Sequence, residues 1–380
     1  MITTFVRDIF RCFLLGILGA AASGIAAEIV VGQVAPFSGA LAPTGKGLQL
    51  GAQVYIDAVN AKGGINGAKI RTVSKDDGYK VDETLKQIKA LLAEHKPVAL
   101  FGLVGTGNVE AILKEGILDA EGVPVVGPRT GAYSLRNPVN PFLFHIRASY
   151  RDETEKMVAH LTPFGIKKIA ALYQDDAFGK DGLSGIEAAM TKRGLSLVAS
   201  GAYEKNTTKV EDAVKTIAKA NPQAVLMISN TAASAEFVKQ YRAIDTGAQL
   251  LTISVTDATG VVKAIGADAA RGLVIVAVVP QPHKRMVSLV KEFQKDFQQY
   301  APKDTELSFS ALEGYVTAKV LVEGLRRAGP NPTRKSLQKG LESINQFDVG
   351  GYEITFGAGN RSGSGFVDIG VIGADGKLKL

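Results

Sequence analysis

Short runs rich in β-forming residues alternate with amphipathic runs of helical length from Glu28 onward. Apolar residues recur at helical spacing between Leu48 and Val59 and stop before Gly63, which is typical of a helix C-terminus. Such alternation favours a parallel sheet with helices on both faces. The first block predicts strands at residues 28–34, 69–74, 98–101 and 123–126, with further helices at 81–94 and 108–120.

The alternation stops at residues 137–150, which carry Pro138 and Pro141, and we interpret this segment as a crossing to a second lobe. Alternation then resumes, and Pro280 and Pro282 mark a return crossing. The three helices that follow have no strands between them, so we expect them to pack on the first lobe. The predicted strands are 168–173, 196–202, 224–229, 250–254 and 273–279, the helices 178–193, 209–220, 233–244, 286–300, 308–328 and 333–344, and a closing hairpin of the second lobe 352–356 with 366–372.

The length of 380 residues suggests two domains at about 100 to 200 residues each. The expected fold class is therefore α/β, with two doubly wound, Rossmann-like lobes. The predicted organisation is a signal peptide at 1–26, a first lobe from 27–147 plus 282–346, and a second lobe from 148–281 plus 347–380.

The first 26 residues have the pattern of a cleaved secretory signal. Arg7 and Arg11 precede an uncharged stretch that ends with the small residues Gly24 and Ala26, and we predict cleavage after Ala26. The stretch is shorter than the ~20 residues that span a bilayer. Cys12 is the only cysteine of the chain and leaves with the leader, so the mature protein has neither a disulfide nor a thiol nucleophile. We expect an exported, periplasmic protein.

The sequence lacks the residues that several functional classes require. The net charge of +7 is scattered in pairs such as Lys167 and Lys168, which gives no nucleic-acid surface. The four histidines form no metal-ligand spacing, and there is no nucleophile elbow or P-loop. Two glycine pairs, 45–47 and 105–107, begin like a dinucleotide loop but lack the third glycine, so no cofactor is expected. The acidic pairs 76–77 and 175–176 are typical of turns or helix caps.

Two glycine-rich loops follow neighbouring strands of the first block. Residues 102–108 run from an apolar strand into a helix, and residues 127–132 follow the next strand. Backbone amides at a helix N-terminus favour an anion such as a carboxylate, and ligands of open α/β sheets bind at the carboxyl ends of the strands. The alternative is that these glycines only make tight turns.

In order and spacing, several segments of the mature chain resemble the type I periplasmic solute-binding proteins of ABC importers, the leucine, isoleucine and valine binding family. The resemblance implies two lobes joined by three strands, a ligand buried in the cleft, and hinge closure that a membrane permease recognises. The segments that carry it are residues 32–39, 51–67, 76–77, 101–107, 147–150, 173–179 and 313–315.

The resemblance also implies roles for single residues. Gly105 and Thr106 anchor a ligand carboxylate, with Gly131 and Ala132 in the adjoining loop, and Ser38 borders the cleft. Tyr150 and Phe178 match positions of cleft-lining aromatics, although plain core packing is the alternative for both.

One departure from the family concerns the ligand. Amino-acid binders of this family place a glutamate, in a Pro-Glu-Gly context, against the ligand ammonium, whereas residues 253–260 here offer only Asp257. Without a carboxylate a buried ammonium stays unpaired. An amine-free carboxylate, including an aromatic acid, or an amide is therefore an alternative ligand, and Arg129 then either helps to hold the acid group or has a surface role.

The leading hypothesis is a non-catalytic, monomeric binding subunit of an ABC uptake system for a branched-chain or related amino acid. The first alternative is a sensor subunit that reports the ligand to a receptor. The second is an exported enzyme, such as a dehydrogenase with an incomplete phosphate loop.

Overall fold

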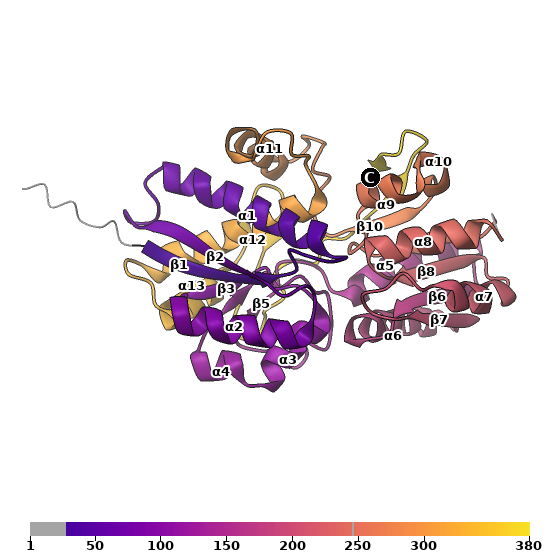
Figure 1. Ribbon diagram of the computed structural model, residues 1–380, viewed down its shortest axis with the longest axis horizontal. Helices are drawn as coiled ribbons and strands as arrows, with labels where there is room; N and C mark the ends of the chain where they lie inside the picture. Colours follow the sequence, from indigo (N-terminus) through magenta and orange to yellow (C-terminus); the bar gives the residue numbers. More distant parts are fainter. Residues whose placement is uncertain (1–27, 245–246) are drawn as a thin grey trace, which may run out of the picture.

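The computed structural model describes residues 28–244 and 247–380, so the expected signal peptide lies outside the described residues. The first lobe is built on a parallel sheet of strand order β2-β1-β3-β4-β5 (Figure 1). The parallel arrangement confirms the expectation from the sequence. Its strands are β1 (Glu28–Ala35), β2 (Lys69–Asp76), β3 (Ala99–Phe101), β4 (Val125–Val126) and β5 (Leu143–Phe144).

Helices from both ends of the chain cover this sheet. The three late helices return to the first lobe as predicted, and Leu312, Leu321 and Leu337 share one buried core with Val31 and Phe101 of the sheet. The predicted helix 108–120 is divided into two, because Gly116 adopts a left-handed conformation (φ 63°) between them. The helices are α1 (Ala42–Ala61), α2 (Val81–His95), α3 (Thr106–Lys114), α4 (Ile117–Glu121), α11 (Ser288–Tyr300), α12 (Phe309–Ala328) and α13 (Arg334–Glu342).

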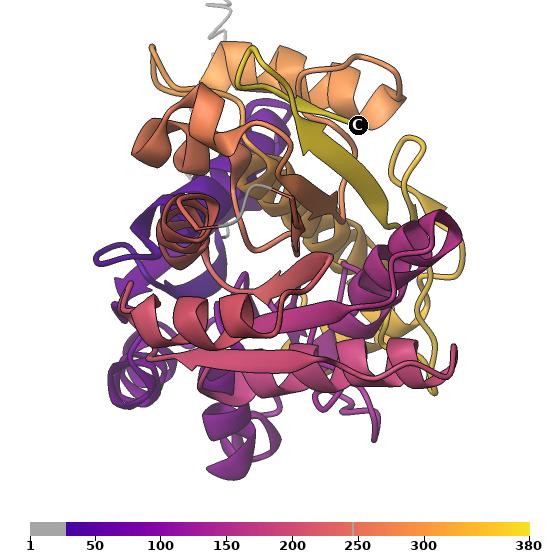
Figure 2. The same cartoon turned by 90° about the vertical axis from the view of Figure 1, so that its right-hand side faces the viewer.

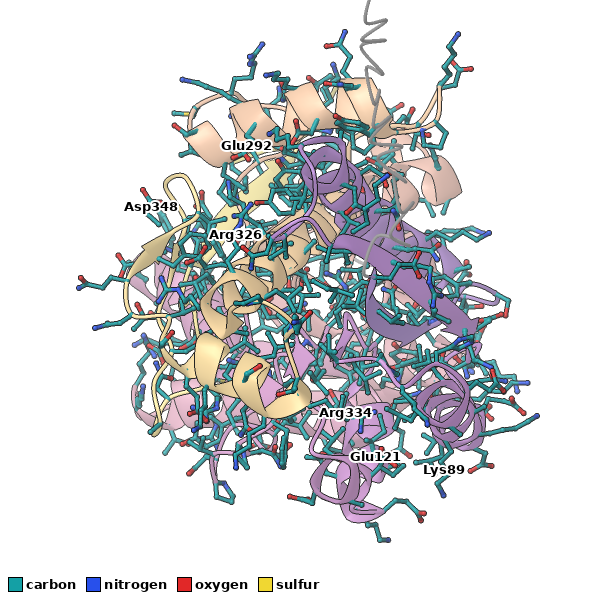
Figure 3. All side chains as sticks on the ribbon, turned by 90° about the vertical axis from the view of Figure 1, so that its left-hand side faces the viewer. Lys89, Glu121, Glu292, Arg326, Arg334 and Asp348 are labelled. Carbon is teal, nitrogen blue, oxygen red and sulfur yellow. The ribbon has the colours of Figure 1, made fainter. Side chains whose placement is uncertain are left out.

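The outer end of this lobe is held by side-chain contacts between distant segments. Arg334 at the start of α13 lies 2.7 Å from the Glu121 carboxylate of α4 and donates through Nε to the Pro97 carbonyl (Figure 3). These bonds fasten α13 to the first half of the sheet. In the described part of the chain, no helix combines the length and apolarity that a membrane span requires.

The second lobe is a seven-stranded sheet of order β14-β13-β10-β9-β8-β6-β7. Strands β6 to β10 pair in parallel, and β13 and β14 add an antiparallel edge. The strands are β6 (Ile169–Gln174), β7 (Ala199–Tyr203), β8 (Ala224–Ile228), β9 (Gln249–Thr252), β10 (Val274–Ala277), β13 (Asp368–Ile372) and β14 (Leu378–Lys379).

Helices lie on both sides of this sheet, as Figure 2 shows from the end of the molecule that the lobe forms. The sequence analysis missed the first of them, although Ser149 and Asp152 form a reciprocal capping box that marks its N-terminus. The helices are α5 (Tyr150–Leu161), a short 3-10 turn (Thr162–Phe164), α6 (Ala177–Thr191), α7 (Glu211–Lys219), α8 (Thr231–Arg242), α9 (Ala258–Ile265) and α10 (Ala267–Ala270).

The chain passes between the lobes three times, at residues 145–149, 278–287 and 355–367. The three segments are bonded to one another. The hydroxyl of buried Tyr352 donates to the carbonyls of Ile146 (2.7 Å) and Val278 (3.0 Å). The amide of His145 donates to Arg361, and the His145 carbonyl accepts from Gly363 (2.7 Å).

The predicted hairpin between 352–356 and 366–372 is wrong. Strand β12 (Glu353–Ile354) pairs with β11 (Phe347–Asp348), whereas β13 pairs with β10 and β14. The physical reason is burial, because Tyr352, Ile354 and Phe356 belong to the core of the first lobe and are drawn away from the second sheet. The true hairpin is β13–β14.

Helices α1 and α12 cross in close contact at two glycines. A Cβ on Gly51 would lie 1.7 Å from the Ala311 carbonyl oxygen, and one on Gly314 would lie 2.1 Å from the Leu48 carbonyl oxygen. The obstructing atoms are backbone, which cannot rotate out of the way. The crossing therefore depends on glycine at both positions.

We expect Gly314→Ala to lower the free energy of unfolding by about 1–3 kcal/mol or more, because the added methyl group forces the two helices apart. Chemical denaturation measures the change. Gly359→Ala is the matched control, since nothing lies within 4 Å of a Cβ at this exposed glycine. Equal stability of the two variants would contradict the close-packed crossing.

Candidate functional site

A pocket lies between the lobes, where the carboxyl ends of both sheets face each other. Each residue that lines it comes after the body of a strand or at its last position, which is where ligands bind in open α/β sheets. Strands β1 to β4 contribute one wall, and strands β6, β8 and β9, together with Tyr150 at the start of α5, contribute the other. The lining residues are Leu41, Thr44, Tyr79, Val104, Gly105, Thr106, Arg129, Tyr150, Gln174, Phe178, Asn230 and Val255.

Gly105 and Thr106 form the floor of the pocket at the N-terminus of α3. Gly105 has φ 102°, and a Cβ there would lie 2.5 Å from the Tyr79 ring, so only glycine fits. Among the described residues no side chain caps this helix end. Its amides therefore face the pocket as donors for an anion.

The hydroxyl of Thr106 belongs to a short chain of hydrogen bonds. Thr130 Oγ1 lies 2.7 Å from Thr106 Oγ1 and accepts from the Ala132 amide (3.1 Å). If the Thr130 proton points to Thr106, the Thr106 proton is left for an acceptor in the pocket. In that orientation Thr106 donates from both its main chain and its side chain.

Gly131 and Ala132 support the pocket from behind and do not line it. The Gly131 carbonyl accepts from the Tyr150 amide (2.6 Å), and a Cβ on Gly131 would lie 2.6 Å from the Tyr150 ring. Ala132 is fully buried. The loop that carries them fixes the place of Tyr150.

Tyr150 and Phe178 both line the pocket. Their rings meet edge to face with centroids 5.3 Å apart, and each side chain is buried. Burial raises the pKa of Tyr150, which keeps the phenol neutral. The pair is packed in the core and also lines the pocket, while its contact with an apolar ligand stays a prediction.

The structure does not bring Ser38 and Asp257 into the lining of this pocket. Ser38 is exposed, and its amide donates to Asp76 Oδ1 (3.3 Å). Burial alone would raise the pKa of Asp76, but hydrogen bonds from Ser38 and from the Gly78 amide outweigh it and lower this pKa. Asp257 caps α9, since its Oδ1 accepts from the Gly260 amide (2.7 Å).

The sequence analysis missed Gln174 and Asn230, two polar residues that line the pocket. Gln174 is fully buried; its amide nitrogen lies 3.4 Å from the Tyr79 hydroxyl, and its oxygen accepts from Tyr203 (3.1 Å). Asn230 caps α8 and lies 3.4 Å from the same Gln174 oxygen. The sequence signal that could have identified them is a polar residue directly at the end of an apolar strand. An apolar strand also precedes the loops 102–108 and 127–132, which the sequence analysis did select.

Behind the pocket lies a buried network of four charges, Arg129, Glu313, Arg147 and Glu153, which we call the ion network. Arg129 bonds Glu313 Oε2, and Arg147 bonds Glu313 Oε1 (3.2 Å) and Glu153 Oε1 (3.0 Å). None of the four side chains is more than 5% exposed. Two charges of each sign make the network neutral.

The ion network joins three parts of the molecule. Arg129 and Glu313 belong to the first lobe, Arg147 to the first crossing segment, and Glu153 to α5 of the second lobe. Burial alone would lower the pKa of Arg147, but the carboxylates of Glu313 and Glu153 raise it above its usual value. Ser254 completes the network, with its amide 2.8 Å from Glu153 Oε2.

Other polar contacts bridge the lobes near the pocket. Lys205 of the second lobe donates to Asn108 of α3 (3.2 Å) and lies 3.9 Å from the centroid of the Tyr79 ring. On the other side, the carboxylate of Asp181 on α6 accepts from the amides of Tyr133 and Ser134, each at 3.0 Å. The structure therefore represents a closed arrangement of the two lobes.

Within residues 28–244 and 247–380, no group of three or more His, Cys, Asp or Glu side chains is arranged to hold a metal ion. The pocket offers hydrogen-bond donors, a guanidinium and apolar walls. These groups are of the kinds that contact small organic ligands in protein pockets.

Residues 28–377 match the periplasmic binding protein family. The chain belongs to this family. Leu/Ile/Val-binding protein homolog 7 of Brucella abortus (strain 2308) is 26% identical over 324 residues, which cover 82% of this chain and 80% of the relative. The family consists of binding and transport proteins, and it matches the α/β fold and the two lobes expected from the sequence.

Solved structures agree with this assignment. The substrate-binding periplasmic protein from Ralstonia solanacearum is 40% identical, with a TM-score of 0.88 over 92% of this chain and 99% of that chain. A branched chain amino acid ABC transporter protein from Thermus thermophilus with bound valine has a TM-score of 0.82 at 17% identity, over 93% and 94% of the two chains. The second likeness shows the fold alone.

We expect Glu153→Gln to lower the free energy of unfolding by about 3–5 kcal/mol, because it leaves a buried excess of positive charge at Arg147. Urea denaturation at neutral pH measures the loss. Glu155→Gln on the same helix is the control; its partners Arg193 and Lys192 lie toward solvent, so it costs about 0–1 kcal/mol. A loss below that of the control would show that the ion network does not stabilise the fold.

Proposed function

We propose that this protein is the substrate-binding subunit of an ABC importer and captures a small organic carboxylate in the pocket between its lobes. The observation that carries the proposal is the uncapped N-terminus of α3 at Gly105 and Thr106, which opens into a pocket walled by both lobes. A second, independent feature points to an anion. Arg129 lines the same pocket and is only 6% exposed, yet its Nε has no partner among the described residues.

Binding would favour closure through contacts that only the closed state supplies. A carboxylate at α3 bonds the first lobe, while Tyr150, Phe178 and Asn230 reach it from the second. Because the open state offers one set of contacts and the closed state both, ligand binding shifts the equilibrium toward closure. The closed form would then present a distinct surface to a permease in the inner membrane.

We place the mature protein in the periplasm as a monomer. The signal-like first 26 residues and membership in the periplasmic binding protein family support this location. The family's role in binding and transport favours delivery of the ligand over catalysis. A sensor subunit would use the same pocket, and a permease and ATPase that bind the closed protein distinguish transport from sensing.

Two ligand classes follow from the residues. A branched-chain amino acid is supported by the name of the Brucella relative and was the leading expectation from the sequence. An amine-free acid is supported by the position of Asp257, which caps α9 outside the pocket lining. Both classes share the carboxylate that α3 and Arg129 would hold.

A thermal-shift screen of amino acids and small carboxylates, followed by calorimetry, tests the proposal. We expect at least one acid to raise the melting temperature through specific binding. Stabilisation by none of them, together with turnover of a substrate, would contradict it.

We expect Thr106→Val to weaken carboxylate binding by about 1–3 kcal/mol, because the pocket loses one hydroxyl donor while its shape is kept. Isothermal titration calorimetry measures the affinity. Thr216→Val is the control, since this exposed hydroxyl on α7 donates only to the Asp212 carbonyl of its own helix. Equal affinity of the two variants would show that Thr106 does not bind the carboxylate.

A further inference from the structure

We infer that the pocket selects a carboxylate that carries no ammonium group, because it joins an anion-binding floor to walls that carry no acidic side chain among the described residues. The inference rests on the proposed function and narrows its ligand class. It predicts that an amine-free acid binds more tightly than the amino acid of the same carbon skeleton.

The pocket offers no carboxylate to an amine. Among the described residues that line it, none is Asp or Glu, whereas one is Arg129. An amino acid held at α3 by its carboxylate brings its ammonium within a few ångströms of the same wall, because the two groups share one carbon. There the ammonium meets helix amides and a guanidinium, which carry charge of its own sign.

Each oxygen of the two buried glutamates behind the wall already accepts a hydrogen bond. Glu313 Oε2 accepts from Arg129 and Oε1 from Arg147. Glu153 Oε1 accepts from Arg147 and from the Ser254 hydroxyl, and its Oε2 accepts from the Ser254 amide. Each of these oxygens keeps a lone pair, but two arginines already balance the charge of the two glutamates, so the glutamates offer little net attraction to an ammonium.

The aspartates near the strand ends also accept hydrogen bonds from the protein. Asp77 accepts from the Tyr79 amide and the Thr84 hydroxyl. Asp176 accepts from Gly179 and Gln174, and Lys205 lies 3.8 Å from it. Asp257 faces the N-terminus of α9. Each of these carboxylates holds a loop or a helix end, and none of them lines the pocket.

The remaining walls suit the body of an acid without further charge. Leu41, Val104 and Val255 are apolar, and Tyr150 with Phe178 adds an aromatic face. The polar groups opposite are the neutral amides of Gln174 and Asn230. The lining thus offers apolar and neutral polar groups to the body of a ligand.

Matched ligand pairs test the inference. Calorimetry compares L-leucine with 4-methylpentanoate and L-phenylalanine with 3-phenylpropanoate, since each pair differs only by the amine. We expect the amine-free member to bind at least tenfold more tightly in any pair that binds. Equal or tighter binding of an amino acid overturns the inference but leaves the proposed function standing. Failure of all four acids, and of every acid in the wider screen, overturns both.

A designed carboxylate tests the cause. Val255 lines the pocket, is half-buried and carries no polar group, so Val255→Asp adds the missing partner, and Val255→Asn is its neutral control of equal size. Relative to Val255→Asn, we expect Val255→Asp to shift the affinity ratio toward the amino acid by at least tenfold. Circular dichroism verifies that both variants fold. An unchanged ratio in the two folded variants would show that a missing carboxylate does not set the selectivity.

Discussion

The buried pairing of two arginines with two glutamates behind the pocket is the interaction on which the arrangement of the lobes depends. A single charge at this depth is strongly unfavourable, whereas the balanced set is tolerated because each group has its partner. Its members come from the first lobe, a crossing segment and the second lobe. The network therefore links the two lobes and the first crossing segment through one set of buried ion pairs.

The pocket follows from this arrangement and from the direction of the strands. Because both sheets present their carboxyl ends to the cleft, the loops and helix N-termini of both lobes meet there. The α3 terminus supplies amides without any charged side chain, and Arg129 supplies a charge that Glu313 already balances. Binding at such a floor relies on oriented dipoles more than on net charge.

Much of the fold was predictable from the sequence, because strand and helix periodicities are local properties. The sequence pattern predicted the strands observed at 69–76 and 169–174, and it predicted that the late helices pack on the first lobe. The site was predictable only where glycine marked a turn, as at Gly105. Gln174 and Asn230 were not predicted, because a single polar residue after a strand is common. The pairing of residues 352–356 was predicted wrongly, because it is set by burial in the first lobe, which is a tertiary effect.

The shared phenol of Tyr352 has a mechanical consequence for how such a molecule opens. It bonds the first and second connecting segments, while the backbone of His145 bonds the first to the third. Segments tied in this way are restrained from moving independently of one another, so sliding of one lobe along the other is resisted.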